Sequence, residues 1–145
     1  MDPKLSVVKA HGFVKNLGFA PHRFESLQKP LSRIVLFFPA FWATLAQISW
    51  ERKGQAEGKA ALAFLEELQT EHCIQAAMLA DAGEENLRLT RLVDYEGFPL
   101  AELPSNVLAF RDRLRQLFSG PSPLCLRTDC FTQHMVQVLR HEYCF

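Results

Sequence analysis

The sequence predicts a single α+β domain, residues 1–145, with a ferredoxin-like βαββα(β) core and extra N- and C-terminal helices. Three features predict this order of elements: a short β-branched and aromatic run, two alternating runs around a glycine-containing turn, and several stretches of helical period. A length of 145 residues, with 48% hydrophobic and 22% charged residues, suits one domain with a full core. An all-α bundle is the main alternative.

The first expected element is a short amphipathic helix over residues 5–17. Its apolar residues fall near helical spacing, and Gly18 is well placed to end it. Pro21 and Pro30 then indicate a loop before the next element.

Seventeen uncharged residues follow, from Ile34 to Trp50. A membrane-spanning helix needs about 20 mostly apolar residues, and this run includes Gln47 and is interrupted by Pro39, which breaks or kinks a continuous helix. We therefore expect no membrane span. The run instead divides into a buried strand over Ser32–Phe38 and a helix from about Ala40 to Arg52 that Pro39 initiates.

The central part of the chain predicts a helix and then a β-hairpin. Glycines near residue 54 predict a break, after which apolar residues at helical spacing predict a helix over 59–71. Residues 74–81 and 87–93 alternate between two faces on either side of a polar turn that contains Gly83, which is typical of a hairpin. Two helices joined at this turn are the alternative.

Two further helices complete the predicted fold. One begins with Ser105 as its cap, carries an apolar stripe, and ends at Ser119 before a Gly-Pro pair. Residues 123–127 form either a short edge strand or a loop. The last helix runs from Cys130 to about Tyr143, capped by residue 128 or 129.

Cysteine and histidine side chains on the last helix are the main candidates for chemistry. Cys130 and His134 are spaced to share a metal ion, and Cys125 could add a third ligand. The spacing matches no common zinc motif, so we expect small apolar side chains at the edge of the core, and no cofactor. A metal-binding or thiol-dependent enzyme or sensor remains the alternative function. Whether the chain is an enzyme stays open.

Four arginines form a second candidate site. Arg88 and Arg91 lie on or beside the second predicted hairpin strand, and Arg111 and Arg115 lie four residues apart on the following helix. Together they could bind an anion or a nucleic acid. Nucleic acid is not favoured, because Phe37 and Phe38 on the first predicted strand are the only aromatic residues on the predicted sheet before Tyr95, too few for bases to stack along it. Pairing with nearby acids is the alternative role for these side chains.

Charge and cysteine content bear on location and partners. The net charge is zero, yet residues 1–50 hold six Lys and Arg against two acids, whereas residues 51–104 hold five against eleven. This pattern suits a mixed solvated surface, with an acidic centre that attracts a basic partner as the alternative. Lysines interrupt any apolar run of signal-peptide length near the N-terminus. We therefore expect four free thiols and a cytoplasmic protein.

The sequence favours a binding function over a catalytic one. It contains no glycine-rich phosphate loop, serine elbow or metalloprotease helix motif. The aromatic residues Phe37, Phe41, Trp42 and Trp50 exceed what one helix face can bury in a core of this size. The leading hypothesis is a small interaction domain, either a homodimer or an accessory or regulatory subunit, with a protein partner contacting these aromatic residues.

Overall fold

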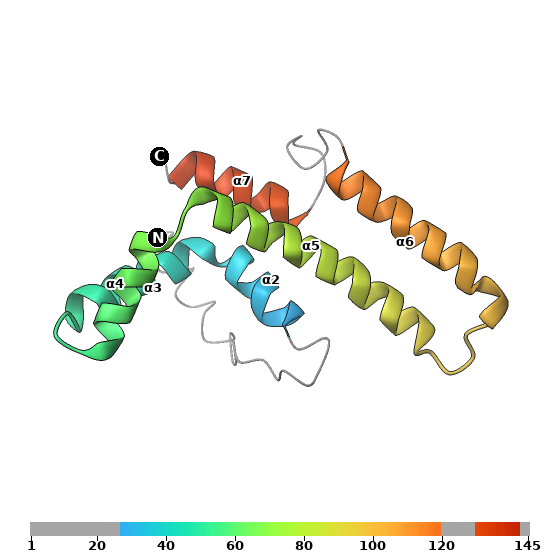
Figure 1. Cartoon of the computed structure of the whole chain (residues 1–145), viewed down its shortest axis with the longest axis horizontal. Coiled ribbons are helices and arrows are strands. Elements are labelled where there is room, and N and C mark those ends of the chain that lie inside the picture. The colour runs from blue at the N-terminus through green and yellow to red at the C-terminus, as the bar shows by residue number, and fades with distance from the viewer. Residues whose placement is uncertain (1–26, 120–129, 143–145) are drawn as a thin grey trace, which may run out of the picture.

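The computed structural model describes residues 27–119 and 130–142, and in these residues every regular element is a helix (Figure 1). The predicted α+β ferredoxin-like fold is therefore wrong, and the alternative all-α fold is correct for this part of the chain. The predicted helix over 5–17, the stretch 123–127 and the caps at 128 and 129 lie outside the described residues. The elements are α2 (Gln28–Leu36), α3 (Phe38–Glu51), α4 (Ala56–Glu67), α5 (Thr70–Val93), the 3₁₀ turn η2 (Leu100–Glu102), α6 (Leu103–Phe118) and α7 (Phe131–Glu142).

The predicted strand over Ser32–Phe38 is helical instead. Pro30 lies in the first turn of α2, where its missing N–H leaves no hydrogen bond unmade. Phe37 then leaves the helical conformation, with φ −107° and ψ 24°, and α3 starts with Pro39 in its own first turn. The two helices meet at 84°. The β-branched residues are tolerated because tertiary burial outweighs local propensity, and Val35 is completely buried.

The predicted hairpin over 74–93 is one continuous helix of 24 residues, α5. Its alternating pattern is coincidental, because most of the residues concerned are Ala, Leu, Met, Gln and Glu, which favour helix. Cys73, Ala77 and Ala80 recur at helical spacing and are all buried. A capping box begins the helix, in which the Gln69 N–H donates to His72 Nδ1 at 3.2 Å.

Gly83 lies in the middle of α5 without breaking it, because α2 crosses there. A Cβ at this position would overlap the Gln28 side chain. Gln28 is buried, and its Nε2 donates to the Ala80 carbonyl at 2.8 Å and to Ser32 Oγ at 2.9 Å. The missing side chain therefore lets α2 and α5 approach closely, joined by a buried hydrogen bond.

The other predicted helices are present with small shifts. The helix expected over 40–52 is α3, and the helix expected over 59–71 is α4, which begins earlier and ends where Leu68 becomes extended. The helix expected from Ser105 is α6, which starts two residues earlier because Pro104 occupies its first turn. Ser105 Oγ therefore donates to the Glu102 carbonyl rather than capping the helix.

Helix α5 is the axis of the molecule (Figure 1). Helices α2, α6 and α7 pack along it, while α3 and α4 form a helical hairpin near its N-terminal end. The core is small and comes from α2, α3, α5 and α7, through Val35, Phe38, Cys73, Ala77, Ala80, Met135 and Leu139. Helix α4 packs mainly on α3, and α6 mainly on α5 and η2. Helices α4 and α6 are thus each covered mainly on one side by the described residues.

None of the helices described between residues 27 and 142 is long and apolar enough to cross a membrane by itself. Helices α2 and α3 together have the length and hydropathy of a membrane span, but a sharp bend separates them.

Candidate interaction surface

Helix α7 is held in place by a carboxylate from another helix. Asp81, in the middle of α5, is 5% exposed. Its Oδ1 accepts the Phe131 N–H at 2.8 Å, and its Oδ2 accepts the Thr132 N–H at 2.9 Å and the Thr132 hydroxyl at 2.6 Å. The first N–H groups of a helix have no partner within it, and a negative charge there also suits the helix dipole. Asp81 therefore caps α7 from outside its own helix.

A polar cavity of about 400 Å³ lies beside this cap, between α5, α6 and α7. Cys130 and His134 line it, and the Cys130 sulfur accepts the Gln133 N–H at 3.4 Å. His134 Nε2 lies 3.3 Å from the Leu36 carbonyl. Cys125 lies outside the described residues. Among residues 27–119 and 130–142 no three Cys, His, Asp or Glu side chains gather closely enough to hold a metal ion.

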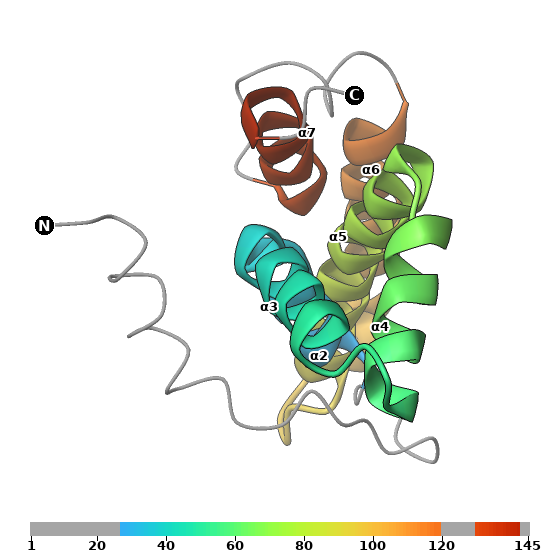
Figure 2. The ribbon, with the colours of Figure 1, turned by 90° about the vertical axis from the view of Figure 1, so that its left-hand side faces the viewer.

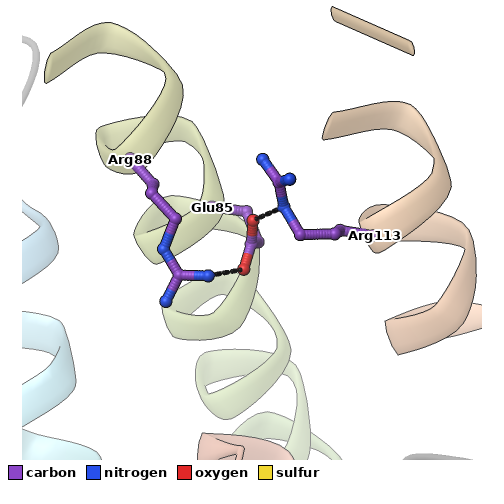
Figure 3. Close-up of polar contacts among 3 residues, drawn as sticks. All are labelled: Glu85, Arg88 and Arg113. Carbon is purple, nitrogen blue, oxygen red and sulfur yellow. Dashed lines mark hydrogen bonds and ion pairs between the residues drawn. The ribbon is translucent and has the colours of Figure 1, made fainter. Parts of the chain in front are cut away.

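The arginines are divided between two places. Glu85, whose side chain is 11% exposed, pairs with Arg88 at 3.0 Å and with Arg113 at 2.5 Å, which links α5 to α6 (Figure 3). Arg111 pairs with its neighbour Asp112 at 2.9 Å on the outer side of α6. Arg91 and Arg115 are exposed on α5 and α6 respectively.

The structure thus brings Arg88 and Arg113 together, and the largely buried carboxylate of Glu85 pairs with both. It leaves Arg111 and Arg115 facing solvent on α6. Arg113, which is not among the four arginines predicted from the sequence, lies on a different side of α6 from Arg111 and Arg115 and faces α5.

The predicted aromatic site residues also have different environments. Phe41 packs edge-on against Phe64 of α4, with ring centroids 6.1 Å apart. Trp42 tilts against Phe38 at the same separation and borders the core. Phe37 is half-buried at the bend between α2 and α3. Trp50, at the end of α3, is 80% exposed. Phe41 and Trp42 therefore hold helices together, and Trp50 is the one of the four that is open to a partner.

An apolar depression of about 420 Å³ lies between α5 and α6. It is lined by Gln75, Met78, Leu79, Ala82 and Phe118. Leu79 is 63% exposed, although it sits in the middle of the central helix of the fold. A helix at the centre of a helical domain normally buries its apolar residues on all sides where neighbours are present. Within residues 27–119 and 130–142, no helix covers the side of α5 on which Leu79 lies.

A smaller apolar depression of about 160 Å³ lies on the opposite flank of Leu79, between α2 and α5. Leu27 and Leu31 of α2 line it together with Leu79 and Leu87. Leu79 therefore stands as a ridge between two depressions. We define the Leu79 surface as Leu27, Leu31, Met78, Leu79 and Phe118.

Helix α6 extends this surface toward the far end of the molecule. It has an apolar stripe, yet none of its residues is buried, and Val107 and Leu108 are 44% and 50% exposed. Tyr95 and Leu100, in the connection between α5 and α6, are 71% and 78% exposed. Packing on α5 alone thus leaves much of the stripe uncovered.

Sequence reasoning did not identify the Leu79 surface. A signal was present, because Leu79 falls at helical spacing with Gln75, Ala82 and Asn86, which places a large apolar residue on the polar side of a helix. The prediction of a strand over residues 74–81 groups every second residue on one face, so it does not bring out this helical spacing.

Comparison of the chain with models of protein families, with curated proteins and with solved structures finds no match.

Proposed function

We propose that this chain is a protein-interaction domain that works through the Leu79 surface, by self-association or as an accessory subunit. The observation that carries the proposal is the exposure of Leu79 between two apolar depressions at the centre of the fold. Contiguous exposed apolar patches on monomeric proteins are small, and larger ones mark interaction sites.

Covering this surface with a partner contributes favourable free energy to binding. Full burial of one Leu, Met or Phe side chain contributes about 1.5 to 3 kcal/mol, and the surface presents several such residues side by side. Because Leu31, Met78 and Leu79 project from α2 and α5, which the core already holds, little conformational freedom of these helices is lost on binding.

The buried thiol of Cys73 argues against this residue as a nucleophile. Burial raises its pKa above the ordinary thiol value, so the reactive thiolate is disfavoured at neutral pH. A buried thiol is also in keeping with a reducing compartment, and the proposal retains the cytoplasmic location that the sequence predicts.

A photo-crosslinking residue placed at position 79 of the full chain, in cells, tests the function. We expect one or a few discrete adducts, because a specific partner covers this site. The matched control is the same residue at Lys53, which is exposed in the turn between α3 and α4. Equal, diffuse labelling at both positions, or none at position 79, would overturn the proposal.

A further inference from the structure

We infer that the partner on the Leu79 surface is a second copy of this chain, packed antiparallel about a two-fold axis near Leu79. This inference rests on the proposed function and specifies its partner. In such a dimer α4 of each copy lies against α6 of the other, while the two α5 helices face each other across the axis.

The first argument is the layout of the open face. Helices α4 and α6 lie on the same side of α5, and α7 lies on the other side (Figure 2), while α4 also packs on α3. They also lie toward opposite ends of the molecule, α4 near the start of α5 and α6 along its second half (Figure 1). The least covered helices therefore lie on one side of α5 toward its two ends, and Leu79 falls between them along α5, beside the depression that α5 and α6 form. A two-fold axis through the middle of that face covers both ends at once.

The second argument is charge complementarity between the two ends. Helix α4 carries Glu57, Glu66 and Glu67 against Lys59, and all four are exposed. No ion pair within the described residues involves Glu66 or Glu67. Their free carboxylates make the α4 end acidic.

Helix α6 has the opposite charge. Arg111 and Arg115 are exposed on it, and the only acid within the helix is Asp112. A parallel arrangement would place acid against acid and base against base. An antiparallel one places the acidic end of each copy against the basic end of the other, and electrostatic complementarity of this kind sets the orientation of an interface.

The third argument is that both ends also expose apolar side chains. Leu62 and Phe64 of α4 are 43% and 45% exposed, and Val107 and Leu108 of α6 are similarly open. Each acidic or basic end thus exposes apolar side chains as well as charges. Interfaces bury apolar residues together with polar ones.

Sedimentation velocity of the full chain over a concentration series is the first test. We expect a dimer whose dissociation constant rises about thirtyfold or more in Leu79→Glu, because a central contact residue is replaced by a charge. Leu36→Glu is the control, because Leu36 is 45% exposed and lines the cavity beside α7 rather than the Leu79 surface, and it should change the constant much less. Far-UV circular dichroism establishes that each variant is folded.

Charge exchange is the second test, and it addresses orientation. A basic-α4 variant (Glu66→Lys with Glu67→Lys) and an acidic-α6 variant (Arg111→Glu with Arg115→Glu) should each dimerise more weakly than wild type, since each faces like charges in its own homodimer. An equimolar mixture of the two should form heterodimers at near wild-type strength, since both contacts are then between opposite charges. Weakened dimers that mixing does not restore would exclude the antiparallel arrangement.

The outcomes separate this inference from the function on which it rests. A monomer at high micromolar concentration, with discrete adducts at position 79 to a different protein, overturns the dimer and retains the interaction domain. An adduct to residues 1–26 within the same chain overturns the dimer and assigns the surface to the chain's own N-terminal segment. Absence of both dimer and adduct overturns both.

Discussion

Asp81 is the single side chain on which the placement of α7 depends most. It accepts three hydrogen bonds from the first two residues of α7 while nearly inaccessible to solvent. A carboxylate in such a position satisfies donors that water cannot reach, so its removal leaves them unpaired. Removal of a carboxylate at the surface has no such consequence, because water replaces the lost acceptor.

We expect Asp81→Ala to lower the free energy of unfolding by about 1 to 3 kcal/mol, because two buried N–H groups and one hydroxyl lose their acceptor. Asp112→Ala, which removes a half-exposed carboxylate on α6, should change it by less than about 0.5 kcal/mol. Urea denaturation measures both. Similar values for the two variants would contradict the capping role.

Cys73 determines a pH dependence of stability. Its folded pKa is raised by burial, so the folded state holds the thiol proton at pH values where the unfolded chain has released it. The contribution of Cys73 to the free energy of unfolding is therefore constant at lower pH. It falls as the pH rises past about 8.5, the ordinary pKa of a thiol.

We accordingly expect the unfolding free energy of wild type to decrease more steeply between pH 8.5 and 10 than that of Cys73→Ala. Chemical denaturation across this range gives the comparison. Parallel pH profiles for the two proteins would show that Cys73 remains accessible to solvent in the folded state.

At the scale of elements, α6 is the helix with the least support. It buries no residue and is linked to α5 by the pair between Arg113 and Glu85 at 2.5 Å. Because Glu85 is largely buried, this pair and its companion from Arg88 carry more weight than surface ion pairs do.

Glu85→Gln should therefore loosen α6 selectively. We expect faster amide hydrogen exchange over residues 103–118, corresponding to about 1 to 2 kcal/mol of lost protection, while α2 and the start of α7 change little. Asp112→Asn, which disrupts only the exposed Arg111 pair, serves as the control. An equal increase in exchange across all helices would mean that Glu85 supports the whole fold.

At the scale of the whole molecule, the described core is confined to one junction. Helices α2, α3, α5 and α7 meet around Val35, Ala77 and Met135, while both ends of the molecule consist of helix pairs. Stability is therefore concentrated where α7 closes over α5, and the open ends are available for association.

Met135→Ala should have one of the largest effects of any substitution, about 2 to 5 kcal/mol, because it opens a cavity at a position that is 1% exposed. Leu100→Ala, at a position that is 78% exposed, should cost less than about 0.5 kcal/mol. Thermal unfolding at low protein concentration separates these effects from association. Comparable losses would indicate that the ends are buried in the monomer.

The sequence by itself determined where several helices lie. Pro39 marks the beginning of α3 and Pro104 that of α6, because proline is favoured in the first turn and excluded further on. The apolar spacing of residues 107–118 identified the stripe of α6. These are local properties of the backbone and of neighbouring side chains, so they can be read without knowing the fold.

Only the tertiary structure decided the fold class, the cap of α7 and the Leu79 surface. Residues 74–81 and 87–93 alternate as strands do although their composition favours helix, and the packing of Cys73, Ala77 and Ala80 in the core agrees with the helix. Asp81 and the N-terminus of α7 are 50 residues apart in the chain, and no local pattern links them. Whether Leu79 is buried or exposed depends on which neighbours α5 has. Contacts between segments that are distant in the chain determine the fold class, the cap of α7 and the exposure of Leu79. Helical periodicity within one segment does not specify these contacts.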